Sequence, residues 1–99
     1  MVRKLNLAEE EIMSQLLQLA NMEVNLKALI VKPLDDGGMG SLAFGPNHEN
    51  RMFGRQASEY TFEDSDGTKV LATLYLDKEG EIYELDVWKV DFSPTQRLK

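Results

Sequence analysis

The sequence predicts an α+β fold in which one N-terminal helix packs on a mainly antiparallel β-meander sheet of four to five strands. Apolar side chains follow a helical period near the N-terminus only, whereas alternating apolar and polar residues fill the second half of the chain between Asp- and Gly-rich turns. The chain has 99 residues, and 27 of them are Leu, Ile, Val or Phe, which is enough for one core. Residues 1–99 are therefore expected to form a single α+β domain.

Residues 7–21 form the expected helix. The apolar side chains that recur at its helical period are Ile12, Leu16, Leu19 and Ala20. Asn6 is placed to cap the first turn, and Glu9 stands three residues later in the position of a capping box. Asn21 is expected to end the helix.

The strands are expected to follow in two groups. Residues 28–34 contain a β-branched pair, the glycine-rich turn 35–40 follows, and residues 41–44 form a short strand before the irregular segment 45–54. The second group is the meander, with strands at residues 55–62, 68–76 and 81–92 and turns at 64–67 and 77–80.

Side-chain parity predicts the register of both hairpins in the meander. The even-numbered apolar residues of the first hairpin share a face only if its loop holds an odd number of residues, which puts Gly67 in the left-handed conformation. In the second hairpin, a four-residue loop pairs Leu76 with Glu81. That register sets Tyr83, Leu85 and Val87 opposite Leu74, Ala72 and Val70.

The opposite face of the predicted sheet also carries large apolar side chains. These are Leu71, Tyr75, Ile82, Trp88, Val90 and Phe92. One helix cannot cover both faces of a sheet, so two solutions stay open. In the first, the chain solves the problem itself: a bulge near residues 86–89 turns the end of the strand inward, or the loop with Met52 and Phe53 folds across the face. In the second, another surface covers the face, either a protein partner or a second copy of the chain in a homodimer.

The charge of the chain favours a protein partner. The formal net charge is −6, and residues 59–91 carry ten acidic side chains against three lysines. Such a field attracts cationic surfaces and repels phosphate backbones, so the expected partner is a protein with a basic surface and not nucleic acid. With no cysteine, no signal-peptide pattern and no long apolar run, we expect a cytoplasmic chain that does not insert into membranes.

No motif predicts a cofactor or a metal site. With Gly67 at the sixth position of a calcium loop, Phe62 and Thr73 would occupy the first and last ligand positions, so the Asp-Ser-Asp-Gly segment is a turn. Residues 37–41 lack the Lys of a phosphate loop and follow two acidic residues. His48 is the sole histidine, and Glu84 and Asp86 share a strand face without a supporting motif. No catalytic residue is therefore predicted.

The last strand is the most distinctive segment. Residues 84–94 read E-L-D-V-W-K-V-D-F-S-P, which resembles the ending of a small, uncharacterised bacterial protein family of about this length. The D-D-G-G-M-G-S and D-x-D-G segments also occur in that family, so the resemblance spans most of residues 1–95. In general style, a small acidic α+β domain is also similar to immunity proteins of bacterial toxin systems, which implies a binding role and no catalytic residue.

The function that these observations favour is a non-enzymatic protein-binding module, immunity-type or regulatory, that uses an acidic and aromatic sheet face. The residues expected to bind are Tyr75, Glu84, Asp86, Trp88 and Phe92. The alternative is a small enzyme or a small-ligand-binding domain that uses Glu84, Asp86 or His48.

Overall fold

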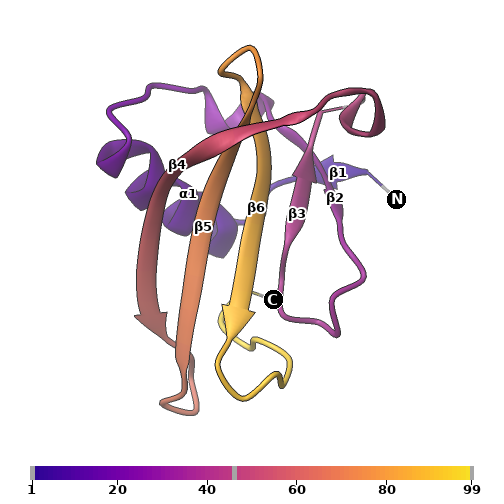
Figure 1. Ribbon diagram of the computed structural model, residues 1–99. Helices are drawn as coiled ribbons and strands as arrows, with labels where there is room; N and C mark the ends of the chain where they lie inside the picture. Colours follow the sequence, from indigo (N-terminus) through magenta and orange to yellow (C-terminus); the bar gives the residue numbers. More distant parts are fainter. Residues whose placement is uncertain (1, 46, 99) are drawn as a thin grey trace.

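The structure is a computed structural model, which describes residues 2–45 and 47–98. In chain order, its elements are β1 (Arg3–Lys4), α1 (Leu7–Leu19), η1 (Leu26–Ala28), β2 (Ile30–Pro33), β3 (Leu42–Phe44), η2 (His48–Asn50), β4 (Phe53–Glu63), β5 (Lys69–Asp77) and β6 (Ile82–Lys89). The strands of the described residues form one antiparallel sheet in the order β1-β2-β3-β6-β5-β4, and α1 packs on one side of it (Figure 1). The predicted α+β class and the N-terminal helix are confirmed, but the sheet has six strands rather than four to five.

The helix α1 begins with the predicted capping box. The Asn6 side chain accepts a hydrogen bond from the backbone N–H of Glu9 at 2.8 Å, and the Glu9 carboxylate accepts one from the Asn6 backbone at 2.9 Å. Glu9 is buried and also receives two hydrogen bonds from the Arg3 guanidinium, at 2.7 and 2.9 Å. The helix ends at Leu19, two residues before the predicted end, because Asn21 has a left-handed backbone (φ 56°) that a helix cannot include.

The core lies between α1 and the sheet. The helix buries Ile12, Met13, Leu16 and Leu17, and the strands β5 and β6 bury Val70, Ala72, Leu74, Leu76, Leu85 and Val87 against them. A polar contact fixes the position of the helix, because the Ser58 hydroxyl on β4 donates a 2.7 Å hydrogen bond to the backbone carbonyl of Leu16. The sheet therefore has one covered face and one face that points away from α1.

The first hairpin has the predicted parity. Phe62 pairs with Val70, and Gly67 in the connecting turn has a φ of 84°. A Cβ atom added to Gly67 would meet no atom within 4 Å, so the backbone conformation alone selects glycine at this position.

Replacing Gly67 with Val is expected to destabilise the domain by about 1–2 kcal/mol, because a β-branched residue resists positive φ. Urea unfolding followed by circular dichroism measures this loss. Gly67→Asn is the matched control, since Asn tolerates the left-handed region better and should lose less. Equal stability of the Val variant and the parent would contradict the role assigned to this turn.

The register predicted for the second hairpin is wrong by two residues over most of its length. Leu76 pairs with Ile82 rather than Glu81, and a bulge at Tyr83 then sets Leu85 opposite Leu74. Val87 accordingly pairs with Ala72, and Lys89 takes the position opposite Val70. Because Tyr83 is an extra residue, the even-numbered Ile82 before it and the odd-numbered Leu85 after it lie on the same face of the sheet. Ile82 therefore points into the core instead of away from it, and Tyr83 is half-buried outside the core cluster.

The bulge that was one possible solution near residues 86–89 is absent, because β6 pairs regularly there and its bulge lies at Tyr83, at the other end of the strand. Trp88 therefore stays on the face opposite α1, and it is 40% exposed. The connection from β3 to β4 does cross one end of this face, as Figure 1 shows, and Phe53 packs edge-on against Tyr75 with ring centroids 5.4 Å apart. The chain's own loop thus covers only part of the face, and Met52 and Phe53 themselves remain largely exposed.

A cluster of charged side chains connects residues 94–97 and β6 to the turn of the hairpin between β4 and β5. The Lys89 ammonium lies 2.7 Å from the Asp64 carboxylate and 2.8 Å from that of Asp66. Asp64 also accepts hydrogen bonds from the backbone N–H groups of Gln96 and Arg97. We refer to Asp64, Asp66 and Lys89 as the Lys89 cluster. It connects the Asp-Ser-Asp-Gly turn to β6 and to the residues that follow β6.

Candidate functional site

The five residues expected to bind a partner gather on the sheet face opposite α1. The antiparallel register of β5 and β6 pairs Tyr75 with Glu84, Thr73 with Asp86, and Leu71 with Trp88. Because side chains alternate along a strand, Tyr75, Glu84, Asp86 and Trp88 all leave the sheet on this side. Phe92 joins them beyond the end of β6, where its ring centroid lies 5.9 Å from that of Trp88.

A sixth residue, Glu59 on β4, extends this set. Glu59 pairs with Thr73, which in turn pairs with Asp86, so the two acidic residues stand on either side of a nearly buried threonine. We call the six residues Glu59, Tyr75, Glu84, Asp86, Trp88 and Phe92 the acidic–aromatic face. Burial, and then the negative charges of Asp86, Glu84 and Glu59, raise the pKa of the Tyr75 phenol.

In the described part of the chain, no lysine or arginine forms an ion pair with the carboxylates of the acidic–aromatic face. The ion-paired lysines and arginines contact other acidic residues, with Arg3 on Glu9, Lys27 on Glu10, Arg51 on Asp77, and Lys89 on Asp64 and Asp66. Asp86 accepts only a 3.3 Å hydrogen bond from the Ser41 hydroxyl, and Glu84 contacts His48. The negative charge of this face is therefore available to a cation from outside.

The aromatic end of the face is exposed and strained. Phe92 is 68% exposed and has a φ of 65°, which is uncommon for a residue with a bulky side chain. Its backbone N–H donates a 2.8 Å hydrogen bond to the Lys89 carbonyl, so a tight turn holds the ring beside Trp88. Backbone strain of this kind is concentrated at functional sites, where the surrounding structure maintains it.

His48 and Glu84, which the sequence offered as candidates for chemistry, meet beside the face. The His48 Nε2 atom lies 3.1 Å from a Glu84 carboxylate oxygen, and the imidazole stacks on the Tyr83 ring at 4.4 Å between centroids. Tyr83 donates a 3.4 Å hydrogen bond to the carbonyl of Arg51, so this contact fastens the segment between β3 and β4 to β6. Asp86 takes no part in it.

The described residues contain no serine–histidine pair and no cluster of metal ligands. Among the residues that the structure describes, no serine hydroxyl is hydrogen-bonded to His48, and Ser41 and Ser58 donate to partners elsewhere. No group of three His, Asp or Glu side chains in residues 2–45 and 47–98 could hold a metal ion. The arrangement offers separated carboxylates between aromatic rings, which suits the docking of cationic side chains.

Sequence reasoning missed Glu59 and the Lys89 cluster. Glu59 was counted in the acidic half of the chain, but only the pairing of β4 with β5 shows that it lies beside Asp86. Lys89 was counted only as one of the three lysines in residues 59–91. The available signal was strand alternation, which puts Lys89 on the core side of the sheet with Leu85 and Val87, and the structure places it opposite Val70.

Residues 2–99 match a sequence family described as a domain of unknown function (DUF6984). The chain belongs to this family. No curated protein and no solved structure matches it. Membership in DUF6984 assigns no role to a residue, so the resemblance to immunity proteins stays a prediction. Within the described ranges, no helix combines the length and the apolar character that a membrane span needs.

Proposed function

We propose that this DUF6984 chain is a non-enzymatic protein-binding module whose acidic–aromatic face docks a cationic surface of a partner protein. The observation that supports this most strongly is the cluster of three carboxylates, Glu59, Glu84 and Asp86, around Tyr75 on an open sheet face. Exposed Trp88 and Phe92 border the carboxylates. Aromatic side chains next to complementary charge are typical of the residues that dominate binding energy.

The chemistry of the face selects Lys and Arg side chains on the partner. A carboxylate attracts the charged head of such a side chain, and an aromatic ring stabilises the same cation through its negative face. The field of the face repels a phosphate backbone, so nucleic acid is a poor ligand for it. An immunity-type or regulatory role in the cytoplasm would use the face to occupy a basic surface on another protein.

Charge reversal on the face is expected to remove the partner. In affinity capture from the native host, the parent should retain a protein with a basic surface, and a Glu59→Lys/Asp86→Lys variant should lose it. The association rate of the purified partner should also fall as ionic strength rises from about 0.01 M to about 0.15 M, because the screening length shortens from about 30 Å to about 8 Å.

The matched control carries the same change of charge away from the face. Glu11 and Glu23 are exposed, so Glu11→Lys/Glu23→Lys should still capture the partner. Both variants should melt close to the parent, because all four side chains are exposed. Capture of the same proteins by both variants, or an association rate that ignores salt, would contradict the proposal.

A second copy of the chain is the competing occupant. A symmetric dimer through this face would bury Trp88 and Phe92, but it would also bring Glu59, Glu84 and Asp86 toward their own copies. Sedimentation at micromolar concentration decides between the two, since a mass near 11.3 kDa excludes the dimer. The enzymatic alternative predicts a turnover that His48→Gln abolishes, whereas the binding proposal predicts capture of the partner by that variant.

A further inference from the structure

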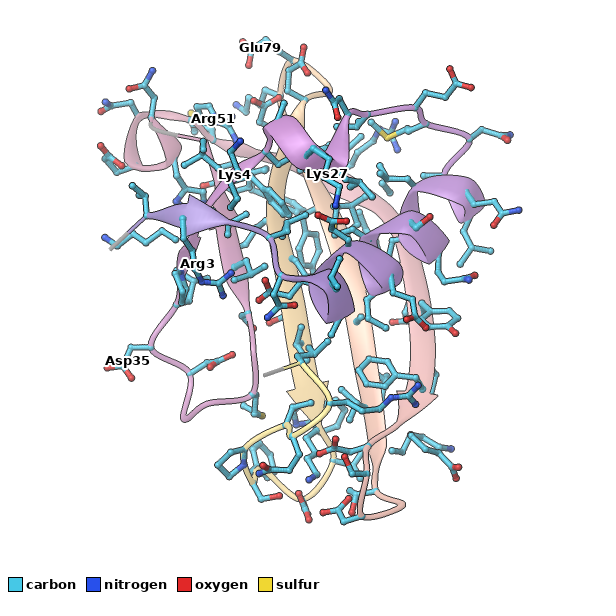
Figure 2. The ribbon with its side chains drawn as sticks, turned by 180° about the vertical axis from the view of Figure 1, so that it is seen from behind. Arg3, Lys4, Lys27, Asp35, Arg51 and Glu79 are labelled. Carbon is cyan, nitrogen blue, oxygen red and sulfur yellow. The ribbon has the colours of Figure 1, made fainter. Side chains whose placement is uncertain are left out.

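A second candidate site lies on the other side of the molecule from the acidic–aromatic face. A pocket of about 520 Å³ opens between β1, the start of α1, the loop that joins β2 to β3, and the C-terminal segment. Its apolar lining includes Leu5, Leu34, Leu42 and Leu98. Figure 2 shows this side, with Arg3 between β1 and the loop that carries Asp35. A volume of this size is within the range of small-molecule sites.

Of the four charged residues in the lining, Arg3, Glu9 and Asp36 are compensated, and Lys4 is exposed to solvent. The Arg3 guanidinium makes two hydrogen bonds with the buried Glu9 carboxylate. The Asp36 carboxylate accepts hydrogen bonds from the backbone N–H groups of Met39, Gly40 and Ser41, at 2.9 to 3.4 Å. A charged group buried among the leucines would therefore lack a buried partner of opposite charge, because Lys4 is exposed to solvent, and its desolvation would be costly.

One residue of the lining carries a polar atom without a partner. The Thr95 side chain is 1% exposed, and its hydroxyl has no hydrogen-bond partner among the described residues. Its backbone N–H donates a 3.1 Å hydrogen bond to the carbonyl of Gly38, so the residue is fixed in position. A buried hydroxyl without a partner is unfavourable, and unpaired groups of this kind in native structures are rare.

We propose that this pocket binds a neutral, mainly apolar small molecule that sets one hydroxyl or carbonyl group against the Thr95 hydroxyl. The leucine lining supplies the apolar contact, and the compensated charges of Arg3, Glu9 and Asp36 offer no strong partner to an ionic ligand. A hydroxyl donates and accepts, so either ligand group can complete its hydrogen bonding. The site uses none of the residues of the acidic–aromatic face, so it stands independently of the proposed function.

Titration of the full chain with 2-naphthol, followed by the backbone amide spectrum of ¹⁵N-labelled protein, tests this site. The expected result is a saturable shift of amides in residues 3–9, 33–42 and 95–98. Thr95→Val keeps the shape of the side chain and removes the hydroxyl, and it should weaken 2-naphthol binding roughly five- to tenfold. Naphthalene lacks the hydroxyl, so its weaker binding should be the same in both proteins.

Two further measurements make the outcome decisive. Leu34→Trp fills the pocket from its half-buried rim and should abolish the amide shifts, while a well-dispersed spectrum shows that the variant is folded. The anion 2-naphthoate should bind more weakly than 2-naphthol. The proposal is overturned by an absence of shifts up to the solubility limit or by shifts centred on Tyr75 and Trp88. The proposal is also overturned if the parent and Thr95→Val bind 2-naphthol with the same affinity, because the Thr95 hydroxyl would then bond only to water.

Discussion

Replacing Lys89 with Met is expected to lower the thermal midpoint of unfolding by at least about 10 °C. The side chains of Lys89 and Asp64 are 1% and 0% exposed, so removal of the ammonium leaves a carboxylate buried without its cation. Breaking a buried ion pair from one side is far more damaging than losing a surface pair. Thermal unfolding followed by circular dichroism measures the change.

Two variants separate this effect from the loss of a positive charge. Lys78 lies exposed in the turn after β5, so Lys78→Met should melt close to the parent. A Lys89→Met/Asp64→Asn double variant should lose less stability than the two single variants together, because the second change removes the uncompensated charge. A Lys89→Met variant that melts like Lys78→Met would show that the Lys89 cluster does not stabilise the fold.

The same cluster predicts a dependence on acid pH. Burial by itself would raise the pKa of the Asp64 carboxyl, but hydrogen bonds from Lys89 and from the backbone N–H groups of Gln96, Arg97 and Ser65 hold it well below its ordinary value. The folded state therefore binds fewer protons than the unfolded state. Its contribution to stability is complete above about pH 4 and is lost as the pH falls further, and Lys89→Met should flatten that decline.

The consequences reach both candidate sites. The residues after β6 include Phe92, whose backbone N–H is hydrogen-bonded to the Lys89 carbonyl, and Thr95, which lines the pocket. Asp64 fixes the same segment through Gln96 and Arg97. The Asp-Ser-Asp-Gly turn and the C-terminal segment are thus held together by the Lys89 cluster and by the hydrogen bonds of Asp64. Both proposed binding sites depend on these contacts.

The local features of the fold were accessible from sequence because local chemistry determines them. The capping box of Asn6 and Glu9 and the positive φ of Gly67 follow from neighbours within a few residues, and all were predicted. The grouping of Tyr75, Glu84, Asp86 and Trp88 on one face was predicted as well, since strand alternation alone determines which side chains share a face.

The missed features depend on contacts between distant segments. The bulge at Tyr83 accompanies the packing of His48, which is 35 residues earlier in the chain, and no local pattern marks it. Strand β1 has only two residues, too few to show a period, and it forms an edge of the sheet beside β2. Lys89 becomes buried only because Asp64 and Asp66 reach it from another hairpin. Sequence periodicity identifies none of these partners, although strand alternation does place Lys89 on the core side of the sheet.

Replacing Gly54 with Ala is expected to destabilise the domain by about 3 kcal/mol, because the added methyl group has no space. A Cβ atom there would lie 2.6 Å from the carbonyl carbon of Asp77, closer still to its oxygen, and 2.9 Å from the Lys78 nitrogen. These are backbone atoms of the turn between β5 and β6, so relief requires the strand β4 to move. Urea unfolding measures the loss.

Gly80 provides the matched control because it lies in the same turn. It has a φ of 83° and open space around it, so Gly80→Ala should lose only about 1 kcal/mol from backbone strain. Displacement of β4 should also separate Phe53 from Tyr75, and changes in the ring signals of Tyr75 would report this loss. Gly54→Ala would then weaken partner binding at the acidic–aromatic face as well, whereas Gly80→Ala would not. If the two variants have equal stability, the close approach of β4 to this turn does not hold the connection from β3 to β4 over the sheet.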